Sequence, residues 1–194
     1  MITILEHINF LKMISTYHGD ITELKVECIV NAANESGLGC FTPNHPCIDN
    51  KIHKKAGPDL LKECLSFPEL SPNVRIPTGT AKLTKAYNLP SKYIIHATGP
   101  SLLKTTDKPD YKMLQQTYTE CLNLAYSKGI QEIAFCCIST GMFGYDKKNS
   151  AQVAFQTVMD WLHSKTRFYD LKVIFVTFTD EDKLLYANLL TSGS

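Results

Sequence analysis

Two cysteines and a histidine lie close together in the segment LGCFTPNHPCIDN, and an aspartate follows them. Cys40, His45 and Cys47 offer two thiolates and one imidazole, a natural ligand set for zinc (Zn²⁺). Structural zinc sites normally use four protein ligands, so a set of three favours a metal that also meets water or a substrate. On spacing alone, a metal site and a loop with incidental thiols are equally good interpretations, because C-x₄-H-x-C is an uncommon zinc pattern.

The composition is that of an ordinary globular protein without a concentrated basic surface. The chain has 194 residues, of which 44% are hydrophobic and 20% charged, and its formal net charge is +1. This charge argues against binding to bulk nucleic acid, which usually rests on clustered Lys and Arg. Residues 1–14 lack the apolar core of a signal peptide, and no apolar run reaches the length of a membrane span. Seven scattered cysteines are typical of a reducing compartment, so we expect a cytoplasmic protein. We also expect a monomer.

Short apolar segments alternate with amphipathic ones, which predicts a mostly parallel sheet covered by helices on both faces. Buried strands are predicted at 26–34, 92–99, 133–140 and 172–180, with the end of another strand near residue 18. Helices are predicted at 111–128, 147–163 and 181–190, and irregular surface chain at 67–84. His96, inside an apolar strand, is predicted to be a buried imidazole with one satisfied hydrogen bond. We therefore expect one α/β domain over residues 1–194, with three α/β/α layers.

Polar segments that contain small residues follow several predicted strands: GDIT at 19–22, NAAN at 31–34 and STGMFGY at 139–145. Ligands of such sheets bind beyond the carboxyl ends of the strands. In the last segment, small residues would let backbone N–H groups converge on an anion just before a helix. A diphosphate could bind there without Lys or Arg, although a Gly-x-x-Gly pattern more often marks an ordinary turn.

Five segments in this order resemble the motifs of the macrodomain, the ADP-ribose-binding fold. They are GDIT, NAAN, IDNKIHKKAGPDLL, PTGTAKLTKAYNLPSKYIIHATGP and ISTGMFGY. The resemblance runs from about His18 to the last predicted helix. It implies a mixed sheet between helices, with ADP-ribose lying across the crest of the sheet. It also implies that the partners are ADP-ribose and mono-ADP-ribosylated proteins.

The resemblance assigns roles to residues at the ends of the strands. Asp20 would accept a hydrogen bond from the adenine amino group, with Ile21 beside it, and Asn34 would meet the distal ribose. The phosphate loop would consist of Ser139, Thr140, Gly141, Met142, Phe143 and Gly144, with its aromatic residue also over the distal ribose. Phe178 would stack on adenine, and a place in the strand core is an equally good interpretation of this residue.

The segment CFTPNHPC stands where most hydrolytic macrodomains carry a glycine-rich run. It resembles the zinc-containing subgroup, whose motif is Cys, four residues, His, one residue and Cys. Cys40, His45 and Cys47 match that motif, and within this family the metal interpretation becomes the stronger one. The resemblance therefore implies zinc as the cofactor.

Asp49 and Asn50 have two interpretations. Either residue could cap a helix that begins near Lys51, because Asp and Asn accept hydrogen bonds from free N–H groups at helix starts. By the resemblance, Asp49 would instead face the distal ribose, where hydrolytic relatives place an acid that positions or activates water. We favour the catalytic role.

The resulting hypothesis is hydrolysis of the bond between the distal-ribose C1″ and a protein side chain. Zinc would polarise a ribose hydroxyl or a water, while Asp49 and Asn34 orient the ribose or accept the proton. Two other functions fit the same residues: a reader that binds ADP-ribose without cleavage, and a deacetylase for O-acetyl-ADP-ribose.

Overall fold

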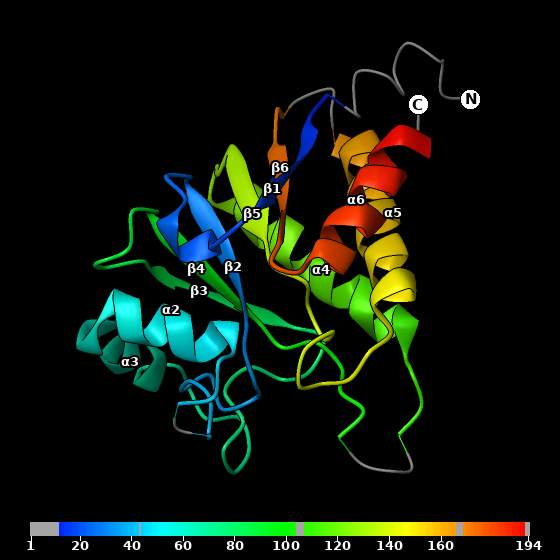
Figure 1. Ribbon diagram of the computed structural model, residues 1–194. Coiled ribbons are helices and arrows are strands. Elements are labelled where there is room, and N and C mark those ends of the chain that lie inside the picture. Colours follow the sequence, from blue (N-terminus) through cyan, green and yellow to red (C-terminus); the bar gives the residue numbers. More distant parts are fainter. Residues whose placement is uncertain (1–11, 43, 104–106, 166–168, 193–194) are drawn as a thin grey trace.

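The computed structural model describes residues 12–42, 44–103, 107–165 and 169–192, which form one six-stranded sheet with helices on both faces (Figure 1). The strands are β1 (Ile14–His18), β2 (Cys28–Ala32), β3 (Ala81–Lys85), β4 (Tyr93–Ala97), β5 (Glu132–Phe135) and β6 (Lys172–Thr177). Their order is β1-β6-β5-β2-β4-β3, and only the β3–β4 pair is antiparallel. The predicted mixed α/β/α architecture is thus confirmed.

The helices divide between the two faces of this sheet. They are the 3₁₀ helix η1 (Ile21–Glu23) and the α-helices α2 (Ile48–Ala56), α3 (Pro58–Leu65), α4 (Tyr111–Ser127), α5 (Lys147–Lys165) and α6 (Asp180–Ser192). Helices α2 and α3 lie on one side, and α4, α5 and α6 lie on the other (Figure 1). Among the described helices, none combines the length and the apolar character that crossing a membrane requires.

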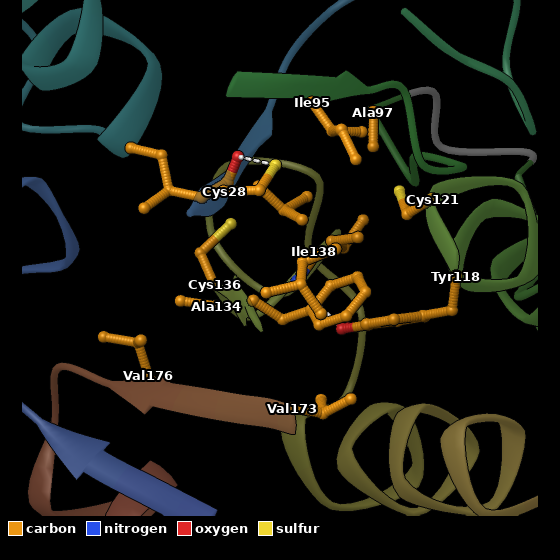
Figure 2. Close-up of a cluster of buried hydrophobic side chains, with 14 of the residues drawn as sticks. Cys28, Ile95, Ala97, Tyr118, Cys121, Ala134, Cys136, Ile138, Val173 and Val176 are labelled. Carbon is orange, nitrogen blue, oxygen red and sulfur yellow. Dashed lines mark hydrogen bonds between the residues drawn. The ribbon is translucent and has the colours of Figure 1, made fainter. Parts of the chain in front are cut away.

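An aromatic core joins the central strands to α4, α5 and α6. Phe135 of β5 and Phe175 of β6 are register partners, so their side chains project from the same face. Tyr118 of α4 lies 5.2 Å from Phe135 between ring centroids, and Tyr186 of α6 stacks on Phe175 at 4.6 Å. Figure 2 shows Tyr118 pointing from α4 into a cluster of buried side chains that includes Ile138. This close packing gives the strand ends a rigid support.

The opposite face of the sheet carries polar side chains beneath α2. Asn31 of β2 and His96 of β4 are register partners, and both are fully buried together with Thr84 of β3. His96 Nδ1 lies 3.1 Å from Asn31 Nδ2, and His96 Nε2 lies 3.0 Å from Thr84 Oγ1. His96 is therefore a buried imidazole as predicted, but it has three hydrogen-bond contacts rather than one, because Cys64 Sγ also lies 3.9 Å from its Nε2.

Three elements were not predicted, and the first of them is the short 3₁₀ helix η1. Residues 67–84 are irregular only as far as residue 80, because β3 begins at Ala81 and pairs with β4. Helix α3 begins at Pro58, directly after Gly57, whose φ of +88° belongs to the region that favours glycine. Strand β3 carries two lysines and lacks an apolar run, and α3 is only eight residues long.

Two predicted helix starts are also corrected. Helix α2 begins at Ile48 rather than near Lys51, and its N-cap is Cys47, whose Sγ accepts a hydrogen bond from the backbone N–H of Asn50. Helix α6 begins at Asp180, and the preceding Thr179 accepts the hydrogen bond from the backbone N–H of Asp182. Each helix therefore starts earlier than the sequence predicted.

The burial of His96 predicts a pH-dependent stability. Burial, with a smaller contribution from His53, lowers the pKa of His96 from 6.5 to about 3. Between these values the unfolded chain binds one more proton than the folded chain, so the free energy of unfolding falls as the pH is lowered. We expect His96 to contribute a loss of about 1.4 kcal/mol per pH unit once the pH is well below 6.5.

Urea unfolding between pH 4 and 7 measures this effect, with His96→Asn as the matched variant because it lacks the titrating imidazole. The slope attributed to His96 is the difference between the two proteins. Equal slopes in both proteins would contradict the prediction.

Candidate functional site

The residues with predicted roles gather at one edge of the sheet. Asp20 follows β1, Asn34 follows β2, and Phe178 follows β6, while residues 139–144 lie in the loop between β5 and α5. These strands are mutually parallel, so their carboxyl ends lie on the same side of the sheet. The structure thus brings together residues that are far apart in the sequence.

Asp20 is held by four hydrogen-bond donors. Its Oδ1 accepts from the backbone N–H of Thr22 at 3.0 Å and from Thr22 Oγ1 at 2.6 Å, which caps η1. Its Oδ2 lies 3.2 Å from the ammonium groups of both Lys51 and Lys55. Burial alone would raise the pKa of Asp20, but these donors outweigh it and hold the pKa well below its ordinary value of 3.8. The carboxylate is therefore charged, and the neighbouring Ile21 is buried.

Phe178 lies beyond the end of β6, with 71% of its surface exposed. The alternative that placed it in the strand core is therefore wrong. Lys51 Nζ lies 5.1 Å from the centroid of its ring, so Lys51 contacts both Asp20 and Phe178. An exposed ring beside a charged carboxylate can stack on a flat heterocycle whose amino group donates to the carboxylate.

The loop of residues 139–144 makes a tight turn with positive φ angles at both of its ends, Ser139 and Gly144. Ser139 is buried with a φ of +67°, and a Cβ added to Gly99 would lie 2.3 Å from Ser139 Oγ. The loop is closed by hydrogen bonds from Gly144 N to Gly141 O and from Tyr145 N to Ser139 O, both at 3.0 Å. Within the described ranges, the backbone N–H groups of residues 140–143 donate no hydrogen bond. These groups can bind an anion.

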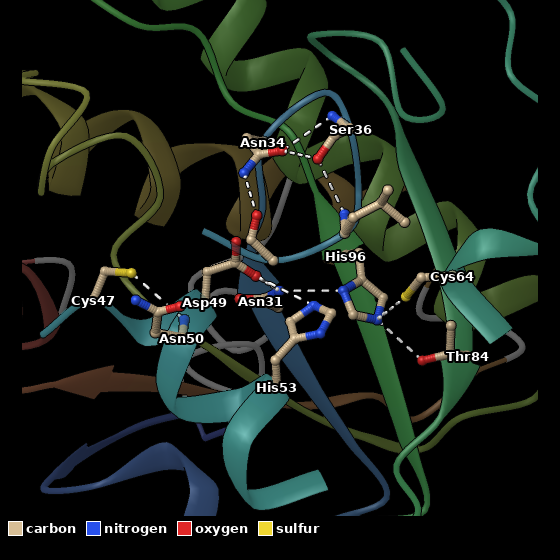
Figure 3. Close-up of polar contacts among 12 residues, drawn as sticks. Asn31, Asn34, Ser36, Cys47, Asp49, Asn50, His53, Cys64, Thr84 and His96 are labelled. Carbon is tan, nitrogen blue, oxygen red and sulfur yellow. Dashed lines mark hydrogen bonds and ion pairs between the residues drawn. The ribbon is translucent and has the colours of Figure 1, made fainter. Parts of the chain in front are cut away.

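Asn34 shapes the loop that carries the cysteines. Its Oδ1 accepts from the backbone N–H of Ser36 at 3.0 Å, and its Nδ2 donates to the carbonyl of Gly39 at 2.8 Å (Figure 3). Asn34 therefore fixes the backbone next to Cys40, and it is partly exposed at the same edge.

Cys40, His45 and Cys47 converge, as the family resemblance implied. One ligand atom from each lies within 4.8 Å of the other two. His45 Nδ1 is buried and has no hydrogen-bond partner in the described part of the chain. Burial and the neighbouring Cys40 raise the pKa of the Cys47 thiol, although the hydrogen bond from Asn50 opposes them. An unpartnered ring nitrogen beside two thiols fits a bound cation, which would favour the thiolate forms.

Asp49 lies in the first turn of α2, two residues after Cys47, and is 4% exposed. Its Oδ1 accepts a hydrogen bond of 2.7 Å from Asn31 Nδ2 and lies 3.5 Å from His53 Nε2 (Figure 3). Burial raises the pKa of Asp49, and the contacts with Asn31 and His53 oppose this increase. Because Cys47 caps the helix, the interpretation of Asp49 as the cap is wrong. A buried carboxylate beside possible metal ligands is suited to proton transfer.

His53, Cys64 and His96 form a second group of possible ligands, deeper under α2. His96 Nε2 already lies 3.0 Å from Thr84 Oγ1, and burial raises the pKa of Cys64 to about 12. This group is therefore better explained as part of a hydrogen-bond network than as a metal site.

No role was predicted for Asn31, Thr84 or Lys51. A polar residue inside a buried strand, such as Asn31 in the NAAN segment, was an available signal. The positions of Thr84 and Lys51 depend on strand pairing and on the start of α2, which no spacing in the sequence indicated.

Comparison with known proteins agrees with this geometry. The Macro domain family model matches residues 30–154. A protein-ADP-ribose hydrolase of Treponema medium is 43% identical over 175 residues, covering 90% of this chain and 66% of that protein. The protein of the same name from Staphylococcus aureus strain MRSA252 is 44% identical over 175 residues, covering 89% of this chain and 64% of that protein. The chain thus spans about two thirds of the length of these relatives.

Solved macrodomain structures share the fold of this chain. The Trypanosoma brucei macrodomain in complex with ADP-ribose superposes with a TM-score of 0.80 at 33% identity, covering 93% of this chain and 70% of that chain. The Oceanobacillus iheyensis macrodomain with ADP superposes with a TM-score of 0.78 at 34% identity, covering 91% of this chain and 89% of that chain.

The contacts of Asp20 predict how its replacement changes stability. Asp20→Ala removes the cap of η1 and should lower the free energy of unfolding by about 1 kcal/mol. Asp20→Asn keeps an acceptor for Thr22 and loses only ion pairs with partly exposed lysines, so we expect a loss of no more than about 0.5 kcal/mol. Urea unfolding at pH 7 measures both. An equal loss in the two variants would show that the cap contributes little.

Proposed function

This chain belongs to the macrodomain family, and we propose that it removes mono-ADP-ribose from modified proteins. The observation that carries this proposal is the buried Asp49 placed two residues from the group of Cys40, His45 and Cys47. A module that only binds a nucleotide needs neither a buried acid nor a set of metal ligands. The names of the two relatives support the same activity.

The nucleotide would lie along the carboxyl edge of the sheet. Asp20 accepts a hydrogen bond from the adenine amino group beside Ile21, and the exposed ring of Phe178 stacks on the base. The free N–H groups of the loop 139–144 bind the diphosphate, so that binding needs no nearby cation. This anchoring carries the distal ribose toward Asn34 and Asp49.

The reaction would replace the protein side chain on C1″ with water. The water oxygen bonds to C1″ as the bond from C1″ to the side chain breaks, and the leaving side chain gains the proton that the water loses. Asp49 accepts and returns this proton, while Asn34 orients the ribose. Cys40, His45 and Cys47 would hold zinc, which when bound supplies a Lewis acid at the ribose end of the site.

Release of ADP-ribose from a mono-ADP-ribosylated protein tests the proposal. We expect Asp49→Asn to lower kcat by about 100-fold or more, because the proton acceptor is lost, while the Kd for free ADP-ribose stays within about threefold. Asp59→Asn is the matched control, since Asp59 is an exposed carboxylate on α3 and should leave kcat unchanged.

Two other outcomes would contradict the proposal. Wild-type protein that binds ADP-ribose without releasing it from the protein substrate would be a reader. Release of acetate from O-acetyl-ADP-ribose, with no cleavage of protein-linked ADP-ribose, would identify a deacetylase.

Elemental analysis of the purified protein tests the metal. We expect about one zinc per chain in the wild type and a loss of most of it in Cys40→Ser and in His45→Ala. Cys64→Ser is the control, because it removes a thiol from the second group of possible ligands and should retain the zinc. Zinc that persists in Cys40→Ser and His45→Ala but disappears in Cys64→Ser would place the metal in the other group.

A further inference from the structure

A row of buried hydrogen bonds runs from the edge strand β3 to Asp49. It passes from Thr84 to His96 at 3.0 Å, from His96 to Asn31 at 3.1 Å, and from Asn31 to Asp49 at 2.7 Å (Figure 3). Thr84, His96 and Asn31 are fully buried, and Asp49 is 4% exposed. Water therefore cannot readily replace any of these partners.

The directions of these hydrogen bonds follow from their atoms. Asn31 Nδ2 can only donate, and it contacts both Asp49 Oδ1 and His96 Nδ1, so each of its two hydrogens has one acceptor. His96 Nδ1 must then accept. A neutral imidazole with a free lone pair on Nδ1 carries its proton on Nε2, which donates to Thr84 Oγ1. The burial that lowers the pKa of His96 keeps the imidazole neutral.

The orientation of the Asn31 amide depends on this acceptor. Its Oδ1 has no hydrogen-bond partner among the described residues, so only the contacts of Nδ2 fix the amide. A rotated amide would direct Oδ1 at both the Asp49 carboxylate and the His96 lone pair, two acceptors. Asp49 Oδ1 and His96 Nδ1 therefore both disfavour the rotated Asn31 amide. Of these two residues, only Asp49 takes part in the proposed reaction.

Asp49 is held through one oxygen. Asn31 and His53 both contact Oδ1, and Oδ2 has no hydrogen bond within the described ranges. We propose that His96 is a positioning residue: by accepting from Asn31 it fixes the amide that holds Asp49 Oδ1, and so leaves Oδ2 available to the reacting water or ribose. This inference rests on the proposed function, because it gives Asp49 its catalytic role.

Two variants of His96 separate positioning from packing. In His96→Asn, the side-chain oxygen stands as many bonds from Cα as Nδ1 does, so the acceptor for Asn31 can be retained. In His96→Leu, an apolar group of similar reach fills the space without an acceptor. We expect His96→Leu to lower kcat for release of ADP-ribose about 10-fold or more, with KM and the Kd for free ADP-ribose within about twofold, and His96→Asn to stay within about threefold of the wild type.

A double-mutant cycle shows whether the effect passes through Asn31. In an Asn31→Ala background, His96→Leu should lower kcat no further, because the amide that it orients is already absent. A role in packing alone would instead give the same kcat for His96→Leu and His96→Asn, or effects that multiply in the double variant. Either result would overturn the inference.

Nitrogen-15 NMR of the ligand-free wild type gives a readout that does not depend on turnover. We expect the Nε2–H tautomer for His96. An Nδ1–H tautomer would overturn the positioning role even if the protein is an active hydrolase. The Nε2–H tautomer in a protein without turnover would overturn the proposed function instead, and would leave the arrangement of hydrogen bonds standing.

Discussion

The hydrogen bond from Asn31 to Asp49 joins the sheet to the helix that follows the cysteine-containing loop. It ties the first turn of α2 to the central strand β2 at 2.7 Å, in a place where a buried carboxylate without a donor would be costly. The same turn is capped by Cys47, so the position of α2 also sets the end of the loop. Asp49 and the nearby end of the cysteine-containing loop are therefore both positioned relative to β2.

At this edge of the sheet, Lys51, Lys55 and Lys147 are paired with carboxylates, so an anion would be bound mainly by backbone N–H groups. Lys51 and Lys55 are engaged with Asp20, and Lys147 at the start of α5 lies 3.0 Å from Glu181 and 3.3 Å from Asp182. In the loop 139–144, the backbone N–H groups of residues 140–143 donate no hydrogen bond within the described ranges. Binding through backbone dipoles is directional, and it is consistent with the formal net charge of +1, which argues against a concentrated basic surface.

The central strands and the residues at their ends were predictable from the sequence. The contacts between side chains of neighbouring strands were not. Apolar runs revealed β2, β4, β5 and β6 because both faces of these strands are buried. The edge strand β3 includes two lysines and lacks such a run. Cys40, His45 and Cys47 were found because they share one loop. The row from Thr84 through His96 to Asn31 was missed because it forms only when β2, β3 and β4 pair. The spacing of residues along the chain does not reveal the register of that pairing.

The cysteine-containing loop is held in place by groups that are not themselves ligands. Asn50 Nδ2 donates to the carbonyls of Thr42 and His45, at 2.9 and 3.0 Å, and Asn34 Nδ2 donates to the carbonyl of Gly39. These bonds are made by the protein's own groups, so part of the entropy of ordering the loop is lost on folding. A cation that binds there would find its ligands close together and would stabilise the thiolate of Cys47, the residue that caps α2. A cation bound in the loop would thus be linked to the placement of Asp49, because Cys47 caps the helix whose first turn carries Asp49.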